Sequence, residues 1–157
     1  MRVVAVREHP EKQKPDVVAE VYPLSQLDTL LAQSDFIVLA APLTPNTRSL
    51  IDAPRLAKMK PDACLINVSR GALIDETALV EALRENKIGG AALDVFTKEP
   101  LAADSPLWDL EHLLITPHTA ALTDKLWERH YVLIKENLRR YLNHEPLLAV
   151  VDKQKGY

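Results

Sequence analysis

Short apolar runs alternate along the chain with longer stretches in which apolar residues recur every three or four positions. The runs are rich in β-branched residues, which is typical of buried strands in a parallel sheet. They lie at Arg2–Val6, Val17–Tyr22, Phe36–Ala40, Ala63–Val68, Ala91–Val95 and Leu113–Thr116, and the second reads as a short edge strand. This alternation predicts an α/β fold assembled from βαβ units.

Four helix-length stretches separate or follow these runs. Residues that favour helix N-termini precede the first three, and the fourth is long and amphipathic. The predicted N-terminal caps are Ser25, which forms a capping-box pattern with Asp28, then Asp52 and Asp75. The long helix covers residues 123–142, and an apolar tail at residues 147–151 follows it.

Composition narrows the class of protein. The chain has 157 residues and a formal net charge of −3, and 26% of its residues are charged. Mild acidity without a basic block argues against nucleic acid or an anionic membrane as the main partner. The lone Cys64 cannot form an internal disulfide, which favours a reducing compartment, so we expect a cytoplasmic protein. No apolar stretch is long enough to predict a membrane span.

Glycine usage excludes two familiar phosphate-binding turns. The four glycines are Gly71, Gly89, Gly90 and Gly156. Their spacing forms neither a Walker loop nor the Gly-x-Gly-x-x-Gly turn of dinucleotide-binding domains. The sequence therefore lacks the usual pyrophosphate-binding turn.

Candidate chemistry gathers where predicted strands end, which is where ligands of open α/β sheets bind. Each candidate has an ordinary reading: Arg70 and His118 as loop residues, Glu99 as a surface acid, and Asp94 as a turn acceptor. Together, however, an arginine, a carboxylate and a histidine at successive strand ends can reduce a 2-oxo acid. A guanidinium binds the substrate carboxylate with two parallel hydrogen bonds. An imidazolium protonates the carbonyl oxygen, and a carboxylate behind the ring fixes its tautomer and stabilises its charge.

Three strings make this combination specific: NVSRGALIDETALVEAL, GAALDVFTKEPL and SPLWDLEHLLITPHTA. In their order and spacing they resemble the D-isomer-specific 2-hydroxyacid dehydrogenases, and the resemblance runs along essentially the whole chain. It implies Arg70 as the substrate-carboxylate anchor, His118 as the general acid/base and Glu99 as its carboxylate partner. It also implies a nicotinamide cofactor, with Asp94 near the nicotinamide and a cleft lined by Pro42, Thr47, Val68 and Ser69. No residue is assigned to a metal.

The chain also departs from this family. Members often carry His before the Pro-Leu-Thr turn and Gly after the Thr-Pro-His run, where this chain has Ala40–Ala41 and Ala121. Members are also roughly twice as long. We therefore expect an incomplete Rossmann-like, doubly wound parallel sheet that lacks the first strand and the substrate domain. Residues 1–122 would form a partial dinucleotide-binding domain, and residues 123–157 the helix and tail that in the family return to the substrate domain.

A missing first strand affects the middle of the sheet, because the Rossmann order is 3-2-1-4-5-6. It would leave residues 3–6 without a neighbour on one side and open an edge on the strand at residues 36–40 or on its neighbour. Exposed edges recruit other strands, and the tail at 147–151 is apolar, so we expect a homodimer. Two alternatives to an enzyme stay open: a non-catalytic interaction module and an inactive remnant.

Arg7 bears on the choice of cofactor. NAD-specific Rossmann domains place an acidic residue near the end of the second strand, whereas an arginine there favours the 2′-phosphate of NADP. Here Arg7 follows that strand, so we favour NADP over NAD. The alternatives are that Arg7 is a plain surface cation, or that Glu8 turns back and repels the phosphate.

Overall fold

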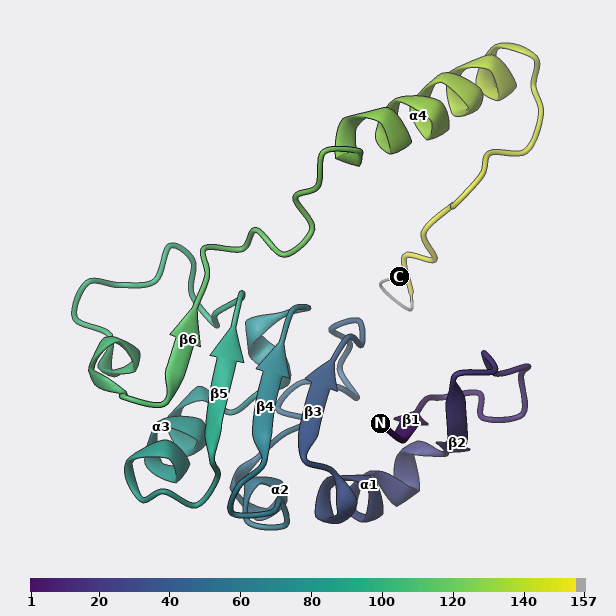
Figure 1. The fold of residues 1–157 in the computed structure, drawn as a ribbon. Helices are drawn as coiled ribbons and strands as arrows, with labels where there is room; N and C mark the ends of the chain where they lie inside the picture. The colour runs from purple at the N-terminus through teal and green to yellow at the C-terminus, as the bar shows by residue number, and fades with distance from the viewer. Residues whose placement is uncertain (155–157) are drawn as a thin grey trace.

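The computed structural model describes residues 1–154 as a parallel α/β arrangement followed by a separate helix (Figure 1). All six predicted strands are present, with ends within two residues of the expected ones. They are β1 Val3–Val6, β2 Val18–Tyr22, β3 Phe36–Leu39, β4 Cys64–Asn67, β5 Gly90–Leu93 and β6 Leu113–Ile115. The helices are α1 Leu27–Gln33, α2 Ala53–Leu56, α3 Glu76–Arg84 and α4 Leu126–Leu142, with 3₁₀ turns at Leu24–Gln26, Gly71–Leu73 and Pro106–Asp109.

Two of the three predicted helix caps are confirmed. The carboxylates of Asp52 and Asp75 accept hydrogen bonds from the backbone N–H groups of Arg55 and Ala78. The Ser25 prediction is wrong, because Ser25 lies inside the 3₁₀ turn that leads into α1 and makes no side-chain cap bond. The long helix begins at Leu126 rather than near residue 123, where the chain still forms a turn.

The sheet is parallel throughout but is divided into two parts. β1 pairs with β2, and a separate four-stranded sheet has the order β3-β4-β5-β6. β1 lies on the side of its pair that is nearer to β3 in Figure 1, and Val4 and Val6 pack against the common core. Within residues 1–154, β1 therefore has a partner on one side only, and β3 is an edge strand.

The core lies between the four-stranded sheet and helices α1 to α3. Alternate strand residues such as Ile37, Leu65 and Leu93 are buried in one cluster with side chains from all three helices. The residues that alternate with them face the other way, and Phe36 and Leu114 are largely exposed there. The helices α1 to α3 thus cover one face of this sheet.

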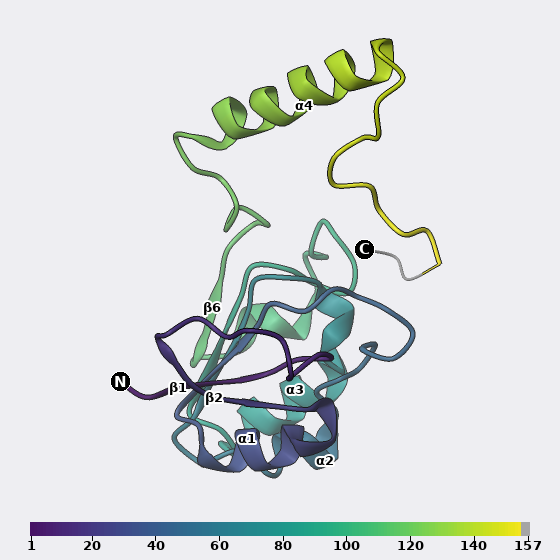
Figure 2. The same cartoon turned by 90° about the vertical axis from the view of Figure 1, so that its right-hand side faces the viewer.

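Helix α4 stands away from the sheet, as the two perpendicular views show (Figures 1 and 2). It has no buried residue, and its apolar side chains from Trp127 onward are exposed. The tail that follows is fastened to it by Asn137, whose amide donates to the Leu148 carbonyl at 3.1 Å and accepts from the Leu148 N–H at 2.8 Å. Within residues 1–154, none of the helices combines the length and apolar character needed to cross a bilayer. The last three residues of the predicted 123–157 segment lie outside the described residues.

Candidate active site

The His118 imidazole and the Glu99 carboxylate, expected from the sequence to work together, are in direct contact. His118 Nδ1 lies 2.7 Å from Glu99 Oε2. The other oxygen, Oε1, accepts a hydrogen bond from the Phe96 N–H at 3.0 Å. Glu99 is therefore fixed at both oxygens, and within residues 1–154 no hydrogen bond occupies Nε2 of His118. A ring held in this way presents Nε2 to solvent or to a ligand.

The charge on Glu99 is stabilised by its surroundings. Its pKa is lowered by the hydrogen bond with His118 first and by the Phe96 N–H second, with partial burial acting in the opposite direction. The charges of His118 and Arg70 lower the pKa of Glu99 further, so Arg70 belongs to the same electrostatic group. An ionised Glu99 is the state that stabilises a protonated imidazole.

His118 sits on a loop with unusual backbone geometry. Its φ of 56° lies in the left-handed region, which few non-glycine residues adopt. The buried Asp94 accepts hydrogen bonds from this loop: from the Thr116 hydroxyl at 2.6 Å and from the N–H groups of Thr119 and Ala120 at 2.8 and 2.9 Å. Burial by itself would raise the pKa of Asp94, but these bonds and the nearby His118 charge lower it overall. Asp94 is thus an anion held by the His118 loop.

Arg70 is exposed at the end of β4, and its Nη1 donates to the Ser69 carbonyl at 2.7 Å. The loop of Arg70 meets the loop of Glu99 at Gly71. A Cβ at Gly71 would lie 2.0 Å from the Phe96 carbonyl carbon, so no larger residue fits. This close approach joins the Arg70 loop to the backbone that holds Glu99.

The residues expected to line a cofactor cleft lie after β3 and β4. The Thr47 hydroxyl donates to the Pro42 carbonyl at 2.7 Å, and the Ser69 hydroxyl donates to the Ala41 carbonyl at 2.5 Å. The first bond lies within the loop after β3, and the second ties that loop to the loop after β4, while Val68 is exposed. Among residues 1–154, no cluster of His, Cys, Asp and Glu is arranged to hold a metal ion.

Arg7 is placed differently from the expectation for a phosphate anchor. Its guanidinium donates to the carbonyls of Gln13 at 3.3 Å and Pro10 at 3.4 Å, and also to that of Lys12. Its Nε is buried without a partner. Arg7 thus organises the loop that follows β1.

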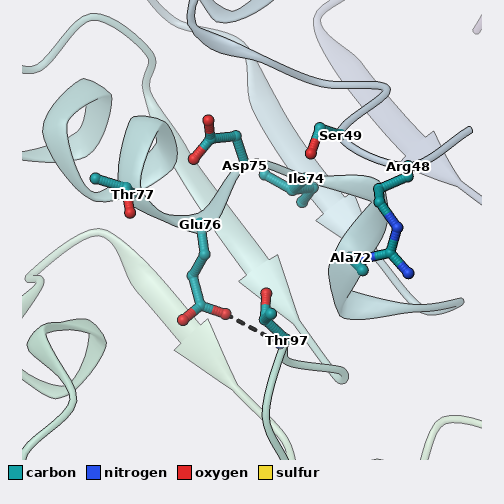
Figure 3. A pocket seen from close by; sticks show the side chains of 8 residues that line it. All are labelled: Arg48, Ser49, Ala72, Ile74, Asp75, Glu76, Thr77 and Thr97. Carbon is teal, nitrogen blue, oxygen red and sulfur yellow. Dashed lines mark hydrogen bonds between the residues drawn. The ribbon is translucent and has the colours of Figure 1, made fainter.

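A surface pocket lies beside these loops (Figure 3). The Glu76 carboxylate in it accepts a hydrogen bond from the Thr97 N–H at 3.1 Å. Its lining is Arg48, Ser49, Ala72, Ile74, Asp75, Glu76, Thr77 and Thr97. None of the predicted site residues belongs to this lining, so the candidate site is defined by the contacts of His118 rather than by this hollow.

The sequence analysis assigned no role to one residue that the structure connects to the site. Asn67, at the end of β4, is completely buried and bonds to the Arg70 loop in two directions. An amide at the end of an apolar strand was the available signal, because a buried polar side chain needs partners.

The sequence profile described as "D-isomer specific 2-hydroxyacid dehydrogenase, NAD binding domain" matches residues 1–120. The chain belongs to this family. One member, "Glyoxylate/hydroxypyruvate reductase B" from Pectobacterium carotovorum subsp. carotovorum (strain PC1), is 57% identical over 97 residues, which are 62% of this chain and 30% of that protein.

Two solved structures of dehydrogenases show the same arrangement. An NADPH-dependent glyoxylate/hydroxypyruvate reductase from Sinorhizobium meliloti, in complex with NADP and sulfate, has a TM-score of 0.88 and 35% identity, covering 99% of this chain and 49% of that one. D-lactate dehydrogenase with NAD⁺ from Lactobacillus jensenii has a TM-score of 0.80 and 28% identity, and the match covers 97% of this chain and 48% of that one. One of these two relatives is thus in complex with NADP and the other with NAD⁺. This chain spans about half or less of the length of the relatives it matches.

Proposed function

We propose that this chain carries the acid/base centre of an NAD(P)-dependent D-2-hydroxyacid dehydrogenase, which interconverts a 2-oxo acid and a D-2-hydroxy acid. The observation that carries the proposal is the 2.7 Å contact between His118 Nδ1 and Glu99 Oε2, with Arg70 in the same electrostatic group. A histidine oriented by a carboxylate through one ring nitrogen can move a proton at the other.

Each residue has a separate task in the proposed reaction. Arg70 binds the substrate carboxylate through its two-pronged guanidinium, which orients the neighbouring carbonyl. In the direction of reduction, His118 donates the proton on Nε2 to the carbonyl oxygen and becomes neutral, while Glu99 stabilises the charged ring beforehand. When bound, the nicotinamide supplies the hydride that reaches the carbonyl carbon. The reverse reaction begins with neutral His118 accepting the hydroxyl proton.

The cofactor residues in this proposal are Pro42, Thr47, Val68 and Ser69, with Asp94 behind the His118 loop. We favour NADP over NAD, with Arg7 as the residue that meets the 2′-phosphate once its hydrogen bonds to the following loop are exchanged. The arginine that follows β1 is the observation behind this preference. Titration of the chain with NADP⁺ and NAD⁺, for the native sequence and for Arg7→Ala, tests it. Equal or tighter binding of NAD⁺ would refute it.

The proposal includes a cytoplasmic homodimer whose chains meet through helix α4. Six apolar side chains on one side of α4 are 58–78% exposed: Trp127, Tyr131, Ile134, Leu138, Tyr141 and Leu142. Aromatic side chains bury about 150–250 Å² each, so this stripe can supply much of the roughly 800 Å² that each partner contributes to a standard interface. Light scattering should give a dimer that Leu138→Glu converts to a monomer. A native monomer at tens of micromolar would contradict the proposal.

The catalytic assignment is tested with the chain as it exists. Oxidation of NADPH is followed with glyoxylate and with hydroxypyruvate, the substrates in the names of two relatives. His118→Gln should reduce turnover about 10²–10⁴-fold, which is the usual contribution of a general acid. The exposed His112→Gln is the matched control. Absence of turnover in the native chain, or equal rates in the two variants, would refute the proposed function.

A further inference from the structure

Two residues with buried polar side chains are linked through their backbones beneath the loops of the candidate site. Among the residues described, the buried polar or charged ones are Asn67 and Asp94, which are 0% and 4% exposed. They end or follow neighbouring strands: Asn67 closes β4 opposite Leu93 of β5, and Asp94 comes next. The Asp94 N–H donates to the Asn67 carbonyl at 3.0 Å, so their backbones are linked directly.

Asn67 holds the Arg70 loop from two directions. Its Nδ2 donates to the Arg70 carbonyl at 2.9 Å, and its Oδ1 accepts from the Ser69 N–H at 3.1 Å. One amide therefore fixes the peptide that precedes Ser69 and the peptide that follows Arg70. A carboxylate of the same size lacks the donor, and an aliphatic side chain lacks both groups.

Asp94 holds the His118 loop in the same way but with acceptors only. Its three bonds come from residues on both sides of His118, namely Thr116 before it and Thr119 and Ala120 after it. Between these anchors His118 keeps a left-handed backbone. The bonds thus confine a histidine to a conformation that it seldom adopts alone.

We propose that Asn67 and Asp94 act as a matched pair of positioning residues, Asn67 for the Arg70 guanidinium and Asp94 for the His118 imidazole. The Arg70 loop is anchored at the end of β4 and the His118 loop at the end of the neighbouring β5, so the sheet sets the separation between the group that binds the substrate carboxylate and the group that protonates its carbonyl. Misplacement by about 1 Å at such a site can cost about a hundred-fold in rate. The inference rests on the proposed function for its catalytic meaning, but its structural content is measurable without turnover.

The two residues should affect different kinetic constants, Asn67 mainly KM and Asp94 mainly kcat. Asn67→Asp removes the donor to the Arg70 carbonyl, so it should raise KM for the 2-oxo acid about ten-fold or more with little change in kcat. Asp94→Asn replaces an acceptor by a donor facing other donors, so it should lower kcat about ten-fold or more with little change in KM. Thr116→Val removes one of the three bonds and should give a smaller effect of the same kind. Asp104→Asn, at an exposed acid, is the control.

The deciding measurement is NMR of the His118 ring, recorded on the same variants of the chain. The native chain and Asp104→Asn should each give one sharp set of ring signals with Nδ1 protonated toward Glu99. Asp94→Asn, and to a smaller extent Thr116→Val, should broaden or split that set, while Asn67→Asp leaves it sharp. Unchanged signals in both Asp94→Asn and Thr116→Val would overturn the inference. The same change of kcat and the same change of KM in the Asn67 and Asp94 variants would also overturn it. Changed His118 signals without turnover in any chain would instead refute the proposed function and leave the positioning role standing.

Discussion

Replacing Glu99 with Gln isolates the role of one negative charge beside His118. The substitution keeps the length of the side chain and an oxygen that can accept from the Phe96 N–H, which Glu99 Oε1 binds at 3.0 Å. It removes the anion whose Oε2 lies 2.7 Å from His118 Nδ1. We therefore expect a folded variant in which the protonated imidazole is less favourable.

The size of the effect follows from the geometry. An opposite charge at this range favours the charged form of a partner by about ten- to a thousand-fold. Because the side chains of Glu99 and His118 are 35% and 48% exposed, solvent screening places the expected loss near the lower limit, about ten-fold. At neutral pH and above, reduction of the 2-oxo acid should slow by about this factor, because it uses the protonated ring. Because the overall equilibrium is fixed at a given pH, kcat/KM for oxidation of the 2-hydroxy acid should fall by the same factor.

The assay measures both directions of the reaction over a range of pH for the native chain, Glu99→Gln and the exposed control Glu111→Gln. The expected signature is a loss of kcat/KM in both directions that is confined to Glu99→Gln. Native values of kcat/KM in Glu99→Gln, or an equal loss in Glu111→Gln, would refute the reasoning.

Three further predictions concern stability, α4 and acid pH. Gly71→Ala places a methyl group against the Phe96 carbonyl, and it should reduce the free energy of urea unfolding by about 2–4 kcal/mol; an unchanged midpoint would show that the two loops can separate freely. Arg139 and then Arg140 lower the pKa of Glu136 from 4.5 to about 2. The ionised Glu136 therefore stabilises α4 fully above about pH 4.5, and this stabilisation is lost as the pH falls toward about 2. Circular dichroism should show that Glu136→Gln removes this acid transition in helix content. The pKa of Glu99 is also lowered, so its contribution to folding should disappear at acid pH in the native chain but not in Glu99→Gln, and identical acid-unfolding curves would count against the ion pair.

The sequence was informative where one local rule decides the structure. Apolar runs located all six strands, and the spacing of strand ends brought Glu99 and His118 together because parallel strands end at one edge of a sheet. Asp52 and Asp75 capped helices because a short carboxylate reaches the backbone N–H three residues on.

Contacts between distant segments were harder to predict. Ser25 obeyed the local capping pattern, but the chain after Pro23 enters α1 through a 3₁₀ turn. Arg7 was assigned to a phosphate, although its nearest acceptors are carbonyls of the loop beside it. Asn67 had no sequence motif of its own, and its role depends on two backbone groups that only the folded Arg70 loop supplies.

The division of the sheet between β1 and β3 also has a consequence for how the molecule opens. β3 to β6 share three ladders and one buried cluster with α1 to α3, whereas β1 and β2 share a single ladder and reach that cluster through Val4 and Val6. Regions with few buried contacts open at lower free energy than the rest of a domain. The β1–β2 pair is therefore a separate unfolding unit, and its amide hydrogens should exchange with solvent well before those of β4 and β5.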